Sequence, residues 1–311
     1  MHKLAFIITQ TPLHIGTSAV DATLDQPILR ERHTGFPILP GSTLKSRFAQ
    51  EWTQAATGSR TEEGLRFFGK NQPGASAPGC IQFTEAKLLA FPVRSARGAF
   101  AWITSPLALR RLVRDGGMPA DLLPSLALRD DQALFSRSSP VTVALGHEAK
   151  VVLEEYTFLH AGDLPATSKA PPPSTKTESG SVSLGDFFQG LLITDVVWQE
   201  VSTRLIVVND GILSALTRLA CEVMPHTTID PQTGATRPGE TYSQENVPAE
   251  TLFFASIHSL AYRSAASPGD QTNPLQIIQS RLHRRIFQFG GDASTGLGFC
   301  RVEVKNAIER S

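Results

Sequence analysis

The chain contains few cysteines, and none of them lies in a metal-binding or redox pattern. Its 311 residues include only Cys80, Cys221 and Cys300, which are far apart in the sequence. No two of them have the Cys-x-x-Cys spacing on which zinc ribbons and thiol–disulfide motifs depend. This usage indicates a reducing compartment and gives no support to a zinc ribbon or a redox motif.

Long apolar segments are also absent. No run approaches the ~20 residues that a helix needs to cross a bilayer. The first ten residues lack the basic-then-apolar layout of a secretory signal, and Leu4, Phe6 and Ile8 alternate as in a β-strand. We therefore expect a cytoplasmic protein without a membrane partner.

Several catalytic motifs are missing. There is no Gly-x-Ser-x-Gly segment, so nucleophilic hydrolysis has no support. The glycine-rich stretch near the end lacks both the lysine of a P-loop and the Gly-x-Gly-x-x-Gly order, which argues against an ATP site. His226, His258 and His283 show no metal-ligand spacing.

Net charge is absent too, because 29 basic residues balance 29 acidic ones, and this argues against general electrostatic attraction to nucleic acid. Only 8 of the basic residues are lysines and 21 are arginines. The planar guanidinium of arginine binds phosphate through two hydrogen bonds and stacks on bases. A GC-rich genome or thermal adaptation would explain the same bias.

The composition, 41% hydrophobic and 19% charged, is that of a globular protein of one large domain or two ordinary ones.

The first half of the chain predicts strands and two helices around a long irregular loop. Ser42 is suited to cap a helix in which Leu44, Phe48 and Trp52 recur every four residues. The other predicted elements are a strand over 3–9, the loop over 12–40, strands over 81–91 and 151–158, and a short helix over 106–114.

The second half alternates strands and helices more regularly. It predicts strands over 204–208, 251–258 and 299–305, a helix capped by Asp210, a helix beginning at Pro274, and a hairpin over 226–247 that turns around Thr233-Gly234. Two split β-α-β units predict an α+β, ferredoxin-like sheet with helices on one face. Such a sheet is a common platform for single-stranded RNA.

One stretch has the composition of an insertion. Residues 161–183 are rich in Pro, Ser, Thr and Lys, with Pro171-Pro172-Pro173 at the centre. Such a composition cannot pack a core, so we expect a mobile segment here.

The irregular loop carries candidate catalytic residues. A loop carboxylate such as Asp25 can bind Mg²⁺ together with water and position a phosphodiester. His14 could donate or accept a proton near neutral pH. The alternative is that Asp25 forms a turn and that His14 is structural.

The start of the first helix is a candidate anion site. A loop ending in Gly41 leads to Ser42, so free backbone N–H groups and the helix dipole would face an incoming phosphate. Lys45 and Arg47 lie in the first two turns, where a cation disfavours the helix unless an anion is near. An ordinary capped helix with solvated charges is the alternative.

A glycine-rich loop is the second candidate phosphate contact. Four glycines lie between Phe289 and Gly298, together with Ser294 and Thr295. Glycines of this density let a phosphate backbone approach closely. The alternative is a tight turn between the last helix and the last strand.

Together and in this order, the segments resemble one family. The Pro12-Leu-His-Ile-Gly16 start, the Asp25-x-Pro-Ile loop ending in Arg-Glu, the Pro40-Gly-Ser-x-Leu-Lys45 helix entry and the Gly290-Gly-Asp-x-x-x-Gly-x-Gly298 loop are similar to the backbone subunit of the type III-B CRISPR (Cmr) effector complex. That subunit is a member of the repeat-associated mysterious protein (RAMP) superfamily. The segment Phe91-Pro-Val-Arg-Ser95 fits the same subunit, and the likeness covers nearly the whole chain except the Pro/Ser/Thr-rich insertion.

The resemblance implies a single RAMP domain over 1–311, shaped like a hand. The ferredoxin-like (RRM-like) palm would comprise 1–11, 41–160, 186–224 and 249–311, with an active-site loop over 12–40, irregular fingers insertions, a flexible insertion over 161–185 and a β-hairpin thumb over 225–248. The implied partners are guide crRNA, target single-stranded RNA, further copies of the chain stacked head to tail, and other RAMP and small subunits.

The resemblance also implies site residues. Asp25 matches the aspartate that supports divalent-metal-dependent cleavage of target RNA, with Mg²⁺ or Mn²⁺ as cofactor, and His14 matches a nearby family position. Implied RNA contacts are Ser42, Lys45, Ser46, Arg47, Arg30, Arg94, Gly290, Gly291, Thr295, Gly296 and Gly298. The return arm of the hairpin departs from the family's aromatic and acidic pattern, because one position that tends to be acidic falls on Gln244. Glu240 and Glu245 are the remaining acidic candidates.

We therefore predict a guide-RNA-binding backbone subunit that is also a metal-dependent endoribonuclease cutting complementary target RNA at regular intervals. Two alternatives stay open. One is a structural subunit in which the cut is disabled. The other is a stand-alone endoribonuclease that matures the guide precursor with a metal-independent, histidine-centred site.

Overall fold

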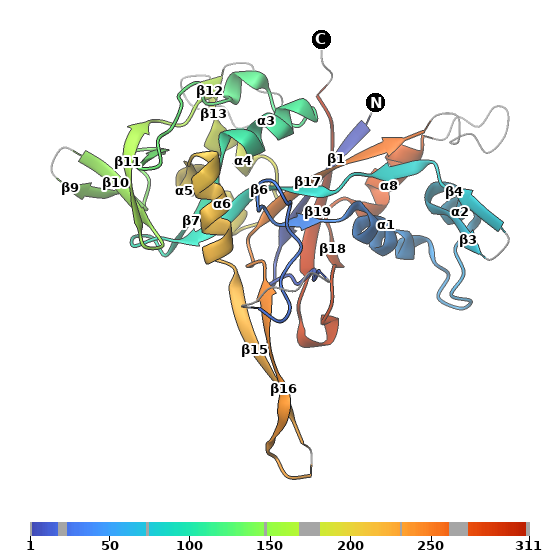
Figure 1. Ribbon diagram of the computed structural model, residues 1–311. Helices are drawn as coiled ribbons and strands as arrows, with labels where there is room; N and C mark the ends of the chain where they lie inside the picture. Colours follow the sequence, from blue (N-terminus) through green and yellow to red (C-terminus); the bar gives the residue numbers. More distant parts are fainter. Residues whose placement is uncertain are drawn as a thin grey trace.

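A large mixed sheet organises the chain (Figure 1). The computed structural model describes residues 2–17, 24–72, 75–145, 148–167, 181–230, 232–260 and 273–308. Within them, 13 strands form one sheet, and the pairs β7–β14 and β8–β11 in it are parallel. Its path is β18 (Arg285–Gln288), β19 (Phe299–Asn306), β1 (His2–Thr9), β17 (Leu252–Ser259), β6 (Ala86–Arg94), β7 (Phe100–Thr104), β14 (Leu205–Val207), β8 (Gln132–Leu134), β11 (Tyr156–Gly162), β10 (Glu148–Leu153) and β9 (Val143–Leu145), with β2 (Ile38–Leu39) beside β6 and β5 (Ile81–Phe83) beside β17.

Four adjacent strands, β19-β1-β17-β6, carry the predicted split β-α-β order. Helix α1 lies between β1 and β6 in the chain, and α8 lies between β17 and β19. The sheet continues well beyond these four strands, through β7 to β9, so it is larger than the predicted one. The helices of the described residues are α1 (Gly41–Ala49), α2 (Glu62–Phe68), α3 (Pro106–Arg114), α4 (Leu184–Gln189), α5 (Val201–Arg204), α6 (Asp210–Leu219) and α8 (Pro274–Leu282).

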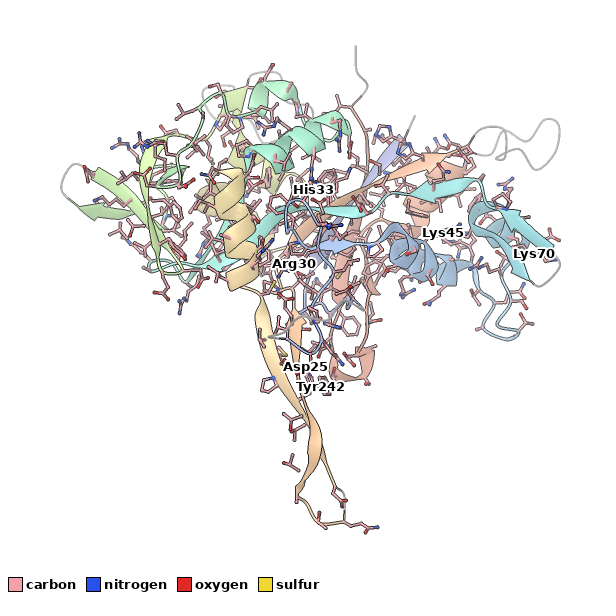
Figure 2. All side chains as sticks on the ribbon, in the orientation of Figure 1. Asp25, Arg30, His33, Lys45, Lys70 and Tyr242 are labelled. Atoms are coloured by element: carbon pink, nitrogen blue, oxygen red, sulfur yellow. The ribbon has the colours of Figure 1, made fainter. Side chains whose placement is uncertain are left out.

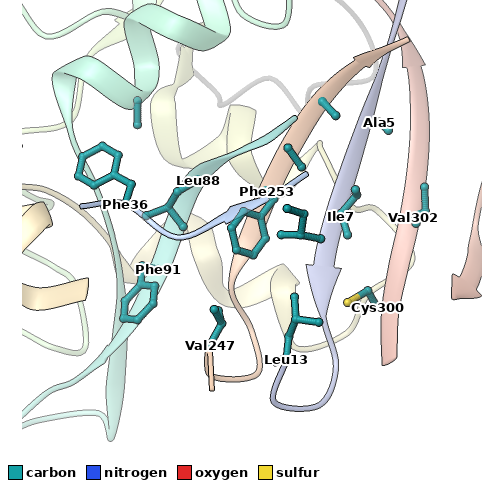
Figure 3. Close-up of a cluster of buried hydrophobic side chains, with 14 of the residues drawn as sticks. Ala5, Ile7, Leu13, Phe36, Leu88, Phe91, Val247, Phe253, Cys300 and Val302 are labelled. Atoms are coloured by element: carbon teal, nitrogen blue, oxygen red, sulfur yellow. The ribbon is translucent and has the colours of Figure 1, made fainter. Parts of the chain in front are cut away.

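Helices cover both faces of the sheet, so the prediction of helices on one face is wrong. Ala5 and Ile7 of β1 belong to a core that includes side chains of α1, α6 and α8, and Figure 3 shows Ile7 beside Phe253 of β17. Leu4, Phe6 and Ile8 belong to a second core with α3 and α4. Because residues 4–8 are all apolar, β1 is buried on both sides, as in sheets that are covered on two faces.

The predicted helices over 106–114 and from Pro274 are confirmed as α3 and α8. Two caps are displaced. Pro40 occupies the N-cap of α1 without a side-chain hydrogen bond, so Ser42 lies inside the helix. Asn209, whose side chain accepts a hydrogen bond from Ile212 N, caps α6 in place of Asp210.

Both long strands predicted in the first half are divided. The segment 81–91 forms β5 and then β6, with a break at Thr84-Glu85. The segment 151–158 forms the end of β10 and the start of β11, which pair as a hairpin. Glu154 has a positive φ of 49° at its turn, and composition alone does not signal that conformation in a non-glycine residue.

The insertion predicted over 161–185 packs at its ends. β12 (Ala166–Thr167) pairs with β13 (Val182–Ser183), and Val182 and Leu184 are buried in the second core. Ser183 caps α4 through a reciprocal capping box with Asp186. The prediction that the whole segment packs no core is therefore wrong for its flanks, and residues 168–180 lie outside the described residues.

A long hairpin projects from the body of the protein (Figure 1). It consists of β15 (Glu222–Ile229) and β16 (Thr236–Asn246), so it begins three residues before the predicted thumb. Its turn is confirmed, because Gly234 N donates to Asp230 O and Gly234 has a φ of 69°. A shorter hairpin pairs β3 (Gly69–Gln72) with β4 (Ala75–Pro78).

Across the described residues, no helix is both long enough and apolar enough to span a membrane.

A half-buried carboxyl at the turn between β16 and β17 makes stability depend on pH. Burial first, and then the negative charge of Asp195, raise the pKa of Glu250 to about 7. The folded state therefore holds this proton more tightly than the unfolded chain, and stability falls as pH rises from about 4.5 to 7. We expect Glu250→Gln to raise the free energy of unfolding at pH 8 by about 1–2 kcal/mol, less than the full pKa shift implies because the group is partly exposed.

Urea unfolding at pH 8 and at pH 4.5 measures this effect, and the gain should disappear at the lower pH. Glu155→Gln is the matched control, since the side chain of Glu155 is 83% exposed. An equal gain at both pH values would contradict the assignment to Glu250 ionisation.

Candidate functional site

The irregular loop lies along the return arm of the hairpin. Gln26 N donates to Ser243 O and Glu245 N donates to Gln26 O, both at 3.0 Å, so Gln26 forms an isolated parallel bridge with Gln244 of β16. Leu13 forms an antiparallel bridge with Val247, the residue that follows β16. These backbone bonds place Asp25 at the base of the hairpin, where Figure 2 shows it near Tyr242.

Asp25 is an exposed carboxylate with a fixed orientation. Its Oδ2 accepts hydrogen bonds from Ser243 N at 2.7 Å and from Ser243 Oγ at 2.9 Å. The backbone hydrogen bond from Ser243, followed by the one from its hydroxyl, lowers the pKa of Asp25 below its usual range. The group is therefore ionised at neutral pH and remains accessible to solvent.

His14 is buried beside the same arm. Its Nδ1 lies 2.7 Å from Glu245 O, and because a carbonyl can only accept, Nδ1 carries a proton. A neutral ring then has an unprotonated Nε2. That nitrogen lies over Gly16, where a Cβ atom would approach it to 2.7 Å. Gly16 therefore makes room for the imidazole.

Glu245 and Arg30 form a structural contact inside the protein. Glu245 is 5% exposed. Its carboxylate accepts a hydrogen bond from Ile28 N at 3.0 Å and pairs closely with the Arg30 guanidinium. Arg30 also donates to Gly35 O and Thr217 O. These contacts tie the loop to the hairpin and to α6. The RNA contact expected for Arg30 stays a prediction.

The glycine-rich loop packs partly on the protein itself. A Cβ atom on Gly290 would lie 2.0 Å from His14 O, and one on Gly298 would lie 1.9 Å from Phe289 O. Close approach of the protein backbone therefore requires glycine at these two positions. Gly291 and Gly296 face open space, and Thr295 is exposed, so this part of the loop is accessible to a phosphate.

The start of α1 has the features of an anion site. Ser42, Lys45 and Ser46 share one face, while Leu44 and Phe48 on the other face are buried. The first turn contains no acidic residue and no side-chain cap. Within the described residues, Lys45 has no ion-pair partner, and Figure 2 shows it well away from Asp25.

The two remaining predicted arginines make contacts within the protein. Arg47, in the last turn of α1, pairs with Glu51 at 3.3 Å and lies over the Phe287 ring. Arg94, at the end of β6, pairs with Glu154 and Glu155 across the β10–β11 turn. Arg94 is 66% exposed, so its ion pairs are weak and exchangeable.

A protein cage for a metal ion is absent from the described residues, where no group of three His, Cys, Asp or Glu side chains converges. Mg²⁺ commonly takes one or two carboxylates and completes its shell with water and substrate phosphate. An ionised, exposed Asp25 fits that mode of binding. Glu245 does not, because Arg30 and Ile28 occupy its oxygens. The side chain of Glu240 lies outside the described residues.

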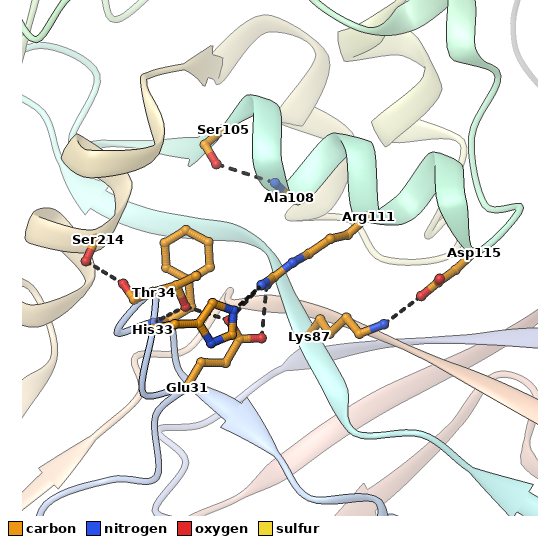
Figure 4. A network of polar contacts seen from close by, with 10 residues as sticks. Glu31, His33, Thr34, Lys87, Ser105, Ala108, Arg111, Asp115 and Ser214 are labelled. Carbon is orange, nitrogen blue, oxygen red and sulfur yellow. Dashed lines mark hydrogen bonds and ion pairs between the residues drawn. The ribbon is translucent and has the colours of Figure 1, made fainter.

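A buried polar network fixes the far end of the loop (Figure 4). Arg111 of α3 donates to both carboxylate oxygens of Glu31, at 3.0 and 2.9 Å. Thr34 Oγ1 donates to Glu31 at 2.5 Å, and His33 lies 3.1 Å from the same guanidinium. Residues 30 and 31 therefore hold the loop from opposite sides, as successive residues of an extended segment do.

Sequence reasoning missed three residues that shape the site. Ser243 orients Asp25 across a separation of 218 residues. Gln288 Nε2 donates to carbonyl oxygens of Phe289 at 3.1 Å and Leu297 at 3.2 Å, which holds the glycine loop closed. Asp292 accepts a hydrogen bond from Gln244. Only Asp292 had a local signal, because it lies within the Gly-Gly-Asp segment.

Comparison with known proteins gives the family. The RAMP superfamily model matches residues 6–301. The CRISPR system Cmr endoribonuclease Cmr4 of Pyrococcus furiosus is 27% identical over 308 residues, which cover 97% of this chain and 95% of that protein. A crystal structure of oligomeric Cmr4 from Pyrococcus furiosus has a TM-score of 0.67 at 25% identity and covers 98% of both chains. A type III-B Cmr-beta structure bound to cognate target RNA, 16% identical with a TM-score of 0.65 over 98% of this chain and 97% of that one, shares the fold. The chain therefore belongs to the RAMP superfamily and is related to Cmr4 of the type III-B Cmr complex.

Proposed function

We propose that the chain is a guide-RNA-binding backbone subunit of a type III-B CRISPR complex that cleaves target RNA. The full-length similarity to a protein named Cmr endoribonuclease Cmr4 supports the class of function. The observation that carries the cleavage proposal is Asp25, an exposed and ionised carboxylate oriented by Ser243 at the base of the hairpin. We further propose that copies of the chain stack head to tail along crRNA and that other RAMP and small subunits are its partners. We also propose that the domain divides into a palm, fingers and a thumb, as the family resemblance implies.

In this proposal each residue near Asp25 has a defined task. A bound Mg²⁺ or Mn²⁺ would supply Lewis-acid stabilisation of charge developing on the scissile phosphate. Asp25 offers one carboxylate for that ion, and Ser243 fixes its direction. Because Nδ1 of His14 is held as a donor to Glu245 O, its Nε2 is the nitrogen available for proton transfer.

Guide binding is assigned to groups that contact phosphate without reading bases. The face of Ser42, Lys45 and Ser46 at the uncapped start of α1 offers N–H groups and the Lys45 ammonium, which has no ion-pair partner in the part of the chain that the structure describes. The accessible half of the glycine loop, Gly291 to Gly296, offers a second approach. Phosphate contacts of this kind accept any guide sequence and make binding strongly dependent on salt.

Cleavage of labelled target RNA by the complex assembled around a guide tests the proposal. Cuts at regular intervals in Mg²⁺, absent in EDTA, are expected. Tight target binding without any cut would instead support a purely structural backbone subunit. The replacement of an acidic position by Gln244 is the observation that favours this second candidate. Cutting of guide precursor by the purified chain alone in EDTA would point to a processing enzyme.

A further inference from the structure

The two faces of β16 hold two different parts of the proposed site. Ser243 binds Asp25 on one face. The side chain of Gln244, which points to the other face because side chains alternate along a strand, donates from Nε2 to Asp292 Oδ2 at 2.8 Å. Figure 1 shows the β18–β19 loop, which carries Asp292, beside the base of the hairpin.

Gln244 is a polar residue at a fully buried position, where an apolar side chain would cost less free energy. Its residue exposure is 0%, and so is that of Asn246 two positions on. Gln244 Oε1 and both polar atoms of Asn246 are buried without a partner among the described residues. Unsatisfied buried polar groups cost stability, so a strand built only for packing would carry apolar side chains here.

Asp292 controls the shape of the exposed loop. It adopts a left-handed conformation with a φ of 57°. Its carbonyl oxygen accepts from Thr295 N at 3.0 Å and from Thr295 Oγ1 at 2.8 Å. The bond from Gln244 therefore fixes the residue around which the accessible part of the loop turns.

A second link closes a ring of hydrogen bonds. Gly291 N donates to His14 O at 3.3 Å, and His14 Nδ1 donates to Glu245 O at 2.7 Å. The ring runs from Gln244 to Asp292, through Gly291 and His14, and back to Glu245. The loop and the residues around Asp25 are thereby held to one strand.

We propose that Gln244 and Asp292 form a positioning pair that aligns the glycine loop with Asp25, so that the guide held by the loop presents the scissile phosphate of the paired target RNA to the carboxylate. This inference rests on the proposed function. An amide is needed at position 244 because a carboxylate there would face Asp292 without a proton between them, and two such groups in contact repel. The glutamine at position 244 is then matched to the carboxylate of Asp292.

Exchanging the partners tests the pair. Gln244→Glu should slow target cleavage by the assembled complex about tenfold or more at pH 8, with target affinity unchanged within about twofold, because small misplacements cost rate and not binding. The double variant Gln244→Glu/Asp292→Asn rebuilds an amide–carboxylate pair with the partners reversed, and should recover at least half of the native rate. Gln276→Glu, at an exposed position of α8, is the control for added charge.

The pH profile separates positioning from a general structural role. In Gln244→Glu the two carboxyl groups can share one proton at low pH, which restores a hydrogen bond. The defect relative to the native complex should therefore shrink as pH falls from 8 to 5.5, and the double variant should show no such trend. A Gln244→Glu complex that cuts at the native rate at pH 8, or a double variant as slow as the single one, would overturn the pair.

A readout that needs no cleavage keeps the test independent of the proposed function. Amide hydrogen exchange of the purified chain should be faster over 290–298 in Gln244→Glu at pH 8 and return to native values in the double variant. If the native complex never cuts, the nuclease proposal fails, and this exchange pattern alone decides whether the pair holds the loop. Unchanged exchange in Gln244→Glu would refute it.

Discussion

Replacing Asp25 with asparagine is expected to slow target-RNA cleavage by about 100-fold or more, with target binding unchanged. Asparagine keeps an oxygen that can accept the Ser243 hydrogen bonds, so the loop should stay docked on β16. It loses the negative charge that a hard divalent cation requires. Loss of a metal that stabilises the transition state by several kcal/mol corresponds to at least two powers of ten in rate.

Single-turnover cleavage with the assembled complex measures this effect, and a gel-shift titration of target RNA measures binding. Asp131→Asn is the matched control, because it makes the same chemical change in an exposed side chain. Asp131 directly precedes β8, and its carbonyl oxygen accepts from Leu159 N of β11. Native cutting by the Asp25→Asn complex would remove Asp25 from the cleavage site. Loss of binding together with cutting would show that the loop had detached.

Local sequence signals predicted two helices and the hairpin turn correctly, because neighbouring residues determine these elements. The Pro106 and Pro274 helices begin where a proline follows a polar cap, and the structure has both caps, Ser105 and Asn273. The hairpin turn was predictable from Thr233-Gly234, since only glycine adopts its positive φ at no steric cost. The predicted strand over 151–158 failed because its turn uses Glu154 rather than glycine.

The arrangement of layers depended on distant parts of the chain. The second core brings α3 and α4 onto the face of β1 opposite α1, and nothing in the spacing of those helices indicates which face they cover. The apolar residues Ala5 and Ile7, between Leu4, Phe6 and Ile8, were the available sign that both faces of β1 are buried.

The site was predictable in its residues but not in their contacts. Asp25, His14 and the glycine loop meet at β16, which the order of the motifs did not indicate, and their ligand and RNA roles remain predictions. The sequence gives no sign that Ser243 orients Asp25 or that Arg30 pairs with Glu245, because these bonds join residues more than 200 positions apart. The sequence also does not show why position 290 requires glycine. The reason is the close approach of the His14 backbone, which is distant in the sequence.

The largest effect on stability is expected from Arg111→Met. The side chains of Arg111 and Glu31 are 10% and 5% exposed, and their two-point contact joins α3 to the loop that carries Asp25. Methionine fills a similar volume but leaves the Glu31 carboxylate buried opposite an apolar group. Removing one partner of a buried pair costs about 3–5 kcal/mol, and urea unfolding at pH 7.5 should show a loss of this size.

The neighbouring arginine supplies the control for that variant. Arg110 lies on the same helix, is 57% exposed, and pairs with Asp210 at 3.3 Å, so Arg110→Met should cost less than about 1 kcal/mol. The double variant Glu31→Leu/Arg111→Met removes both charges and should recover most of the stability lost in Arg111→Met, since apolar replacement of a buried pair is often close to neutral. Equal losses in Arg110→Met and Arg111→Met would contradict the assignment. Recovery of stability without recovery of target cleavage would show that the pair contributes the position of the Asp25 loop as well as the free energy of folding.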